Sequence, residues 1–549
     1  MVELNSLCSN TLSFMKNTRV IDIEDVNKNY FHNLPSGEYT IKVVGSRNKE
    51  KFNKLGRYLV FHDLKINLDL SDYKIDVLDN GVFINAISLV SITLPDSVIE
   101  IKDKVFRGCL NLTTINIFPG LTKIGNTTFK DCESLSNIIL PESIQEIGSG
   151  VFYGCKSLKK IIVPNNITEI KDDTFYACEN LENIILPNSI KKIGHAAFCC
   201  CSKLENIRIP KNVRVIGSYA FGGCVNLISI NIPKKVSIIE PSAFVFCESL
   251  SIINTSEANE KYISLEGVLY LKDITRIIAY PCNKLEESYS IPNTVTGIED
   301  YAFFGCEKLK NITIPESVQD IGVSAFADCK KLSNITIPES VQQIGESAFK
   351  DCESLSSITI PDSVLQIGVS AFAGCKKLSN ITIPKSVQQI GVSAFKGCES
   401  LSSIIIPDSV EIIGEKTFIG CKRLSNIILG KGIKKIPSGI FNSCENLSSI
   451  SIPYGITRIC EDAFKDCKNL DTITIPKSVS IIESGVFVGC DKLKEVILPK
   501  KCYVYGVAFG AREKDLKIIK YQKSKVERLV QKSITNISRI FRRKIHGKR

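Results

Sequence analysis

The sequence lacks tryptophan altogether and contains only two methionines and four histidines. The histidines are His32, His62, His195 and His546, and none of them lies near a serine or cysteine in a pattern typical of a nucleophile. No nucleophile elbow, zinc-protease helix motif or phosphate-binding loop occurs either. These absences argue against an enzyme, and we predict no catalytic residue.

Long apolar runs are also missing. No stretch of eighteen or more apolar residues occurs, so we expect no membrane-spanning helix. The first residues, MVELNSLCSNTLSFMKNTR, have neither the basic start nor the apolar centre of a signal peptide. Val2 excludes N-myristoylation, and the final His-Gly-Lys-Arg is not a prenylation box. The missing signal peptide suggests a cytoplasmic location.

Cysteine, in contrast, is abundant and periodic. Of the 22 cysteines, seven lie 23 residues apart from Cys109 to Cys247, and nine more keep this spacing from Cys306 to Cys490. A phenylalanine stands three residues before each of them and a leucine three residues after. A fixed period of this length predicts a solenoid of stacked coils, about twenty in this chain.

The repeat unit begins with a strand pattern. Its consensus is L-x-x-I-x-I-P-x-S-V-x-x-I-G-x-x-A-F-x-x-C-x-x. In the segment LSNITI, the alternation of apolar and polar residues predicts a short strand with Leu332, Ile335 and Ile337 directed inward. Pro338 should end this strand, because it has no N–H to donate.

The second half of the unit adds a further inward pair and a turn. Val341 and Ile344 are expected to face the core, Gly345 to permit the next turn, and Phe349 to fill the far end. One coil cannot bury its own apolar edges, so the coils must stack. The predicted fold class is an α/β repeat solenoid, a right-handed leucine-rich-repeat coil of 23-residue units with parallel strands.

The periodic cysteines are expected to be small buried side chains. Stacked Cβ vectors run parallel to one another, which does not suit a disulfide, and a cell interior would keep the thiols reduced. His195, Cys199, Cys200 and Cys201 could suggest a metal site, but zinc sites usually add a second pair of ligands and none follows here. We therefore interpret these residues as turn and core residues and expect no metal and no cofactor.

A column of alternating charge accompanies the repeat. The residue after the cysteine alternates in sign over nine coils. These residues are Glu307, Lys330, Glu353, Lys376, Glu399, Lys422, Glu445, Lys468 and Asp491. Because several of these coils are nearly identical, a shift of one coil would bring like charges together, and we expect the column to help fix the register.

At this point the sequence resembles the BspA-like leucine-rich repeat proteins. The resemblance rests on units of the form IPxSVxxIGxxAFxxCxxL, such as Ile360 to Leu378, and on a break between Cys247 and Cys306 that contains GVLYLKD and IIAYP. It covers about residues 80–510. It implies a surface-antigen or adhesin-like protein without enzymatic activity, which recognises a protein or glycan.

The repeat also divides the chain into regions. We expect a small N-terminal α/β cap over 1–80, leucine-rich repeats over 81–255 and 292–513, and an irregular insert over 256–291. In the cap, residues 38–44 and 58–61 are typical of strands, and residues 9–17 of a short helix. Residues 499–513 form a degraded last coil.

The remaining segment, 514–549, is a basic amphipathic tail with 13 Lys and Arg against 2 Asp and Glu, which accounts for the whole formal net charge of +11. Apolar residues recur from Val526 to Ile545 at helical spacing. Cationic residues lie mostly beside that stripe, namely Lys525, Arg528, Lys532, Arg539, Arg542 and Arg543.

Three interpretations of this tail remain open: a helix that caps the solenoid, an in-plane contact with an anionic membrane, and a nuclear-import or nucleic-acid patch. The scarcity of aromatic residues argues against nucleic acid.

The outward positions of the predicted strands form an uncharged grid. They are Asn311, Thr313, Asn334, Thr336, Ser357, Thr359, Asn380 and Thr382. The grid is either a simple solvated strand face or a recognition face for a protein or glycan.

Our first hypothesis is a surface recognition protein that uses this face. The alternative is an intracellular interaction scaffold whose tail is a cap, a membrane contact or a nuclear address. The cell surface, implied by the resemblance, and the cytoplasm, implied by the missing signal peptide, both remain open.

Overall fold

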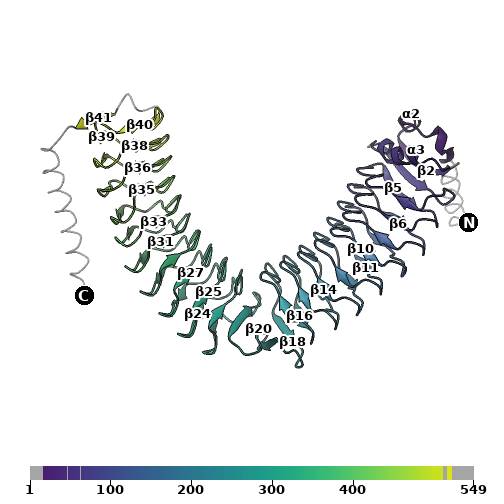
Figure 1. Ribbon diagram of the computed structural model, residues 1–549, viewed down its shortest axis with the longest axis horizontal. Coiled ribbons are helices and arrows are strands. Elements are labelled where there is room, and N and C mark those ends of the chain that lie inside the picture. Colours follow the sequence, from purple (N-terminus) through teal and green to yellow (C-terminus); the bar gives the residue numbers. More distant parts are fainter. Residues whose placement is uncertain (1–16, 46, 62, 511–515, 522–549) are drawn as a thin grey trace, which may run out of the picture. The chain divides into compact units, whose positions relative to one another are not determined.

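The computed structural model describes residues 17–45, 47–61, 63–510 and 516–521. It is a parallel-strand β-solenoid of about 22 turns with repeats of about 23 residues, which confirms the predicted solenoid. The chain divides into two compact units. The first unit contains residues 1–273 and 279–284, and the second contains residues 274–278 and 285–549. Figure 1 shows the coils stacked one on another within each unit.

Each coil has two strand-bearing sides and one turn side. The LxxIxI segment forms the first strand, whose outward surface we call the strand face, and the xxIG segment forms a shorter second strand. In the coil that starts at Leu332, the side chains of Leu332, Ile335 and Ile337 are buried as predicted, while Asn334 and Thr336 are exposed. The AFxxC segment forms the turn side and contains no helix. The helical part of the predicted α/β class is thus absent from the described coils.

From β5 (Leu89–Thr93) onward, the parallel strands of the first unit pair in register with the strands 23 residues away. Those of the strand face are β1 (Thr18–Asp22), β2 (Gly37–Val44), β3 (Leu64–Asp69), β5 (Leu89–Thr93), β7 (Thr114–Asn116), β9 (Asn137–Ile138), β11 (Lys160–Ile162), β13 (Asn183–Ile185), β16 (Ser229–Ile232) and β18 (Ile252–Thr255). Those of the second side are β4 (Val77–Leu78), β6 (Glu100–Ile101), β8 (Lys123–Ile124), β10 (Glu146–Ile147), β12 (Glu169–Ile170), β14 (Lys192–Ile193), β15 (Val215–Ile216) and β17 (Ile238–Ile239).

The second unit repeats the same arrangement. Its strand face contains β22 (Ser288–Ser290), β24 (Asn311–Thr313), β26 (Asn334–Ile335), β28 (Ser357–Thr359), β30 (Asn380–Thr382), β32 (Ser403–Ile405), β34 (Asn426–Ile428), β37 (Thr472–Thr474), β39 (Glu495–Pro499) and β41 (Lys517–Tyr521). Its second side contains β21 (Arg276–Ala279), β23 (Gly297–Ile298), β25 (Asp320–Ile321), β27 (Gln343–Ile344), β29 (Gln366–Ile367), β31 (Gln389–Ile390), β33 (Ile412–Ile413), β35 (Lys435–Ile436), β36 (Arg458–Ile459), β38 (Ile481–Ile482) and β40 (Tyr503–Val504).

The core of each unit is a stack of like residues. Successive phenylalanine rings, Phe83 to Phe244 in the first unit and Phe303 to Phe509 in the second, lie nearly parallel with centroids 5.1–5.9 Å apart. Offset stacking at this distance is favourable beyond the burial of the rings alone. Phe509, although one residue out of the period, still stacks 5.4 Å from Phe487. The degraded last coil therefore continues this phenylalanine ladder.

The periodic cysteines form a second ladder beside the phenylalanine ladder. From Cys109 to Cys247 and from Cys329 to Cys490, each thiol donates to the carbonyl oxygen of the phenylalanine 26 residues earlier, at 3.0–3.2 Å. These cysteines are free and buried, as predicted. Burial raises the pKa of Cys421 to about 12. The cysteine thus fills a small space and also binds a carbonyl of the neighbouring coil, a contact that alanine could not make.

The tight turn of each coil is made by positions other than the expected glycine. Two positions per coil have positive φ, five residues and one residue before the ladder cysteine, as at Ser347 (φ 54°) and Asp351 (φ 57°). Gly345 is not among the positive-φ glycines, so the prediction that it permits the turn by conformational freedom was wrong. A Cβ atom on Gly345 would instead lie 2.7 Å from the carbonyl oxygen of Gly322 in the preceding coil. This glycine is required because two backbones approach closely.

The N-terminal region extends the strand-face sheet of the first unit. β1, β2 and β3 run parallel, and β3 pairs with β5 of the first repeat. The short helices η1 (Ile23–Asp25), α2 (Lys28–His32), α3 (Lys49–Leu55) and η2 (Gly56–Tyr58) connect these strands. The ring of Phe52 in α3 lies edge-on to Phe83 at 6.0 Å and so covers the first ring of the ladder. The strand predicted at 38–44 is confirmed as β2, whereas residues 58–61 form no strand. The helix expected at 9–17 lies almost entirely outside the described residues.

The insert contains an antiparallel hairpin in the first unit. β19 (Tyr262–Leu265) pairs with β20 (Val268–Leu271), and the amide of Ile253 in β18 donates to Gly267 at 2.9 Å. Asn259, which is buried, donates to the carbonyls of Pro233 and Val236 and accepts from two backbone amides of the hairpin. The insert, which we expected to be irregular, therefore contains a regular hairpin that hydrogen bonds to Asn259 hold in place.

The described part of the expected tail is a strand. Lys517–Tyr521 form β41, which runs parallel to β39 in the second unit. Residues 522–549, including the basic residues from Lys525 to Arg543, lie outside the described residues. The expectation of a helix there remains a prediction.

Candidate recognition face

The eight predicted strand-face residues lie in two columns of the second unit. Seven of them are exposed, and Asn311 is half-buried. The parallel register places Ser357 beside Asn380 and Thr359 beside Thr382. Neighbouring residues of a column are therefore about 4.8 Å apart, the spacing of adjacent strands. The structure thus brings the predicted residues together on one surface.

The asparagine column makes hydrogen bonds along its own length. The amide nitrogen of Asn334 donates to Oδ1 of Asn311 at 2.8 Å, and that of Asn311 donates to Ser288 Oγ at 3.0 Å. The amide nitrogen of Asn380 donates to Ser379 Oγ at 3.3 Å. The amide groups of Asn334 and Asn311 therefore link neighbouring coils, whereas that of Asn380 is bonded within its own coil, and all three offer less to a ligand.

The threonine column, Thr313, Thr336, Thr359 and Thr382, differs in this respect. All four side chains are exposed, and within the described ranges their hydroxyl groups have no partner in the chain. Each hydroxyl can donate one hydrogen bond and accept two, and each methyl group adds apolar surface. Of the two predicted columns, this one is therefore better suited to bind a partner.

The strand face of the second unit is uncharged over a long stretch. From Ser333 to Ser451, the outward strand positions carry only serine, asparagine, threonine and isoleucine. Charged side chains lie at the two ends of this stretch, where Lys310 pairs with Glu287 at 2.8 Å and Lys494 pairs with Asp471 at 3.0 Å. Such a surface has few charges to desolvate when a neutral partner covers it.

Exposed isoleucines extend the threonine column, and the sequence analysis did not single them out. Ile405 and Ile428 occupy the next two positions of the column and are 45% and 42% exposed. In the first unit, Ile139, Ile162 and Ile185 occupy the same repeat position and are 76%, 49% and 55% exposed. The 23-residue register alone could have revealed them, because each stands at an outward position where most coils carry a polar residue.

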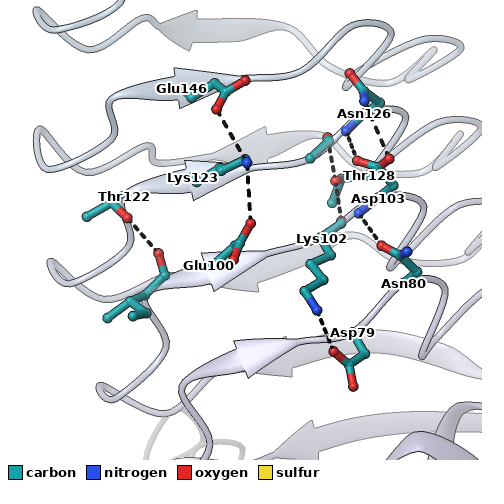
Figure 2. A network of polar contacts seen from close by, with 12 residues as sticks. Asp79, Asn80, Glu100, Lys102, Asp103, Thr122, Lys123, Asn126, Thr128 and Glu146 are labelled. Atoms are coloured by element: carbon teal, nitrogen blue, oxygen red, sulfur yellow. Dashed lines mark hydrogen bonds and ion pairs between the residues drawn. The ribbon is translucent and has the colours of Figure 1, made fainter.

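The other two sides of the coils carry ion pairs between neighbouring coils. On the second side of the first unit, Lys123 lies 3.5 Å from both Glu100 and Glu146 (Figure 2), and these carboxylates raise the pKa of its ammonium group. On the turn side of the second unit, the predicted charge column forms pairs such as Lys330–Glu307 at 2.5 Å and Lys376–Glu353 at 2.8 Å. Both sets join adjacent coils, which gives these sides a structural role.

The residues considered for metal binding lie on the turn side. The backbone amide of His195 donates to Asp172 Oδ1 at 2.8 Å, and Cys201 is a buried member of the cysteine ladder. Within the residues that the structure describes, no group of three or more His, Cys, Asp or Glu side chains could hold a metal ion. No helix in the described ranges is long and apolar enough to cross a bilayer.

Comparison with known proteins identifies the repeat. The family model for the BspA type leucine-rich repeat region matches residues 76–185, 168–279, 272–402 and 388–514. No curated protein matches the chain.

Several solved structures are similar. A leucine-rich cell surface protein from Faecalibacterium prausnitzii is 25% identical over 81% of this chain and 86% of its own, with a TM-score of 0.33. A leucine-rich repeat protein from Bacteroides ovatus is 26% identical over 82% of this chain and 88% of its own, with a TM-score of 0.32. The pneumococcal vaccine antigen PcpA is 20% identical over 83% of this chain and 86% of its own, with a TM-score of 0.28.

Proposed function

Because the chain belongs to the BspA type leucine-rich repeat family, we propose that it is a non-catalytic recognition protein that binds a protein or glycan through its strand face. The observation that carries this proposal is the exposed threonine column from Thr313 to Thr382, whose hydroxyl groups have no partner within the described chain. Regularly spaced hydroxyl and methyl groups on a rigid sheet suit a partner that is neutral and polar, such as a glycan or an uncharged protein surface.

The test places charge and bulk on this column. The double variant Thr336→Arg, Thr359→Arg should keep its fold, because both side chains are exposed, and should lose binding to a glycan array and to cell-surface proteins that the unaltered chain binds. The matched control is Gln343→Arg, Gln366→Arg, which places the same charges on the second side of the same two coils. Binding that survives the threonine changes, or that the control abolishes equally, would contradict the proposal.

We further propose that the chain acts at the cell surface, in keeping with the resemblance of its repeats to surface antigens. Labelling intact cells with a membrane-impermeant reagent tests this location. If the chain is labelled in intact cells, the surface proposal is supported. If it is labelled only after lysis, the alternative of an intracellular interaction scaffold is favoured, with the basic tail 514–549 as a cap, membrane contact or nuclear address.

A further inference from the structure

One coil of the first unit carries two cysteines that are not part of the cysteine ladder. Cys199 and Cys200 immediately precede the ladder residue Cys201. The same two repeat positions hold Tyr176 and Ala177 in the preceding coil and two glycines in the following one. The pair is therefore not required by the repeat.

The geometry of this pair differs from that of the ladder thiols. The sulfur atoms of Cys199 and Cys200 are 3.7 Å apart, and both side chains are partly exposed. Cys201, by contrast, is fully buried and donates to the carbonyl of Phe175 at 3.2 Å. Two accessible sulfur atoms this close can form a bond with each other after a small movement, whereas a buried thiol cannot meet an oxidant.

The backbone around the pair is held by both neighbouring coils. The amide of Cys200 donates to Gly222 at 2.7 Å, and the carbonyl of Cys199 accepts from Ala177 at 2.8 Å. Cys200 has a φ of 61°, in the left-handed region, which is the conformation of the turn at this repeat position. The two sulfur atoms are thus kept near each other by the fold.

A row of side chains from earlier coils leads to this pair. Lys130 Nζ lies 3.8 Å from the ring centroid of Tyr153, which stacks on Tyr176 at 4.5 Å. The sulfur atoms of Cys199 and Cys200 share a hydrogen bond in which either thiol can donate, and when Cys200 is ionised its sulfur accepts from both Cys199 and the hydroxyl group of Tyr176. On the other side, Gly223 has no side chain, and a Cβ atom there would come within 3.2 Å of the Cys200 sulfur. The sulfur is therefore stabilised from one side and uncrowded on the other.

These donors also favour the ionised form of the thiol. The hydrogen bonds from Cys199 and, to a smaller extent, Tyr176 lower the pKa of Cys200 to about 6, while burial and the nearby Glu179 oppose the shift. The thiolate is the nucleophilic form of cysteine, so Cys200 carries a larger fraction of reactive sulfur at neutral pH than an ordinary thiol.

We propose that Cys199 and Cys200 form a reactive dithiol site that hydroperoxides oxidise to a disulfide between the two adjacent residues. The Cys200 thiolate attacks one oxygen of the peroxide, the O–O bond breaks, and a proton completes the departing alcohol or water. Cys200 becomes a sulfenic acid, oxidised by two electrons, while the peroxide is reduced by two. The Cys199 thiol then attacks this sulfur, the S–O bond breaks, and water leaves as the S–S bond forms. A small thiol reductant reverses the change, because exposed and strained disulfides are the labile ones.

Trypsin cleavage after Lys192 and Lys203 releases the peptide IGHAAFCCCSK, which contains the pair and one ladder cysteine. The folded full-length chain is treated with a small excess of hydrogen peroxide, then denatured, alkylated and digested. Without peroxide, the three thiols of this peptide should each carry an alkyl group. After peroxide, we expect one alkyl group and a mass lower by two hydrogens, because two of the cysteines form a disulfide. Cys199→Ser should stop the reaction at a sulfenic acid that dimedone traps, and Cys200→Ser should abolish both products.

Cys282 serves as the internal control, because its side chain is partly exposed but its thiol donates to the carbonyl of Cys247 at 2.8 Å. It should remain unoxidised under the same conditions. Alkylation of Cys200 in a folded Cys199→Ala chain should reach half its maximal rate at a higher pH than in the unaltered chain, because the donor at residue 199 is lost. A peptide that takes three alkyl groups after peroxide treatment, or oxidation of Cys282 at the same rate, would overturn the proposal.

Discussion

At the residue scale, two glycines of one coil have different roles. A Cβ atom on Gly391 would lie 2.5 Å from the carbonyl carbon of Gly368 in the preceding coil. Gly397 has a φ of 70°, but a Cβ atom there would meet no atom closer than 3.8 Å. Its repeat position accepts Asp351 and Ala177 in other coils, both with positive φ. The first glycine is thus required by the close approach of two backbones, whereas the second is only favoured by its backbone conformation.

This difference predicts unequal effects of the same substitution. Gly391→Ala should force two coils apart and lower the free energy of unfolding by about 3 kcal/mol, as overpacking does. Gly397→Ala should cost only about 1 kcal/mol, the ordinary penalty for a left-handed residue with a side chain. Urea unfolding of both variants measures the difference. If Gly397→Ala proved as damaging as Gly391→Ala, the close approach of the coil backbones would not be the limiting factor.

At the element scale, the charge column joins coils in pairs. Ion pairs form between Lys330 and Glu307, Lys376 and Glu353, Lys422 and Glu399, and Lys468 and Glu445. Single exposed pairs contribute little, so the value of the column lies in its alternation. Because the coils between 330 and 422 are nearly identical in sequence, alternation distinguishes the correct neighbour from a coil shifted by one.

Changing all four lysines to glutamate should therefore lower both the unfolding midpoint and its cooperativity at low salt, and added salt should restore part of the loss. The matched control inverts all nine charges of the column and so keeps the alternation. It should unfold like the unaltered chain. If the all-acidic and inverted variants unfold alike, alternation does not contribute to register.

Much of the fold at this scale could be predicted from the sequence. The 23-residue period predicted the coil, its buried leucine and isoleucine positions, and the phenylalanine and cysteine ladders. Each of these features depends on the same residue type recurring at the same repeat position. The role of Gly345 could not be predicted, since a glycine needed for close approach and one needed for positive φ look alike in sequence. The hairpin at 262–271 depends on the buried contacts of Asn259, which no periodicity indicates.

The alternation in the sequence predicted where the eight strand-face residues lie, but not their hydrogen bonds, and their role in binding remains a prediction. The eight strand-face residues do share one surface, as the alternation in the strands indicated. Their hydrogen bonds could not be predicted, because asparagine and threonine at neighbouring outward positions look equally free in sequence. In the structure, Asn334 bonds to Asn311 while Thr336 remains exposed without a partner in the described chain. The longer asparagine amide reaches the side chain of the neighbouring coil here, as Asn334 reaches Asn311.

At the scale of the whole molecule, the coils place different chemistry on their three sides. The second side and the turn side carry ion pairs between neighbouring coils, as in Glu100–Lys123–Glu146 and Lys376–Glu353. The strand face of the second unit is uncharged between its ends and exposes the threonine column. The strand face also joins neighbouring coils, for example through the Asn334–Asn311 hydrogen bond, but its threonine hydroxyl groups remain available to a partner, and this is the physical basis of the proposed recognition function.

The most direct measurement of this claim is photo-crosslinking from two positions of the same coil. A diazirine side chain is placed at residue 336 on the strand face or at residue 343 on the second side, and each chain is irradiated with the surface material that it binds. The account predicts that covalent adducts form from position 336 and remain at background from position 343. Adducts that form equally from both positions, or only from position 343, would contradict it.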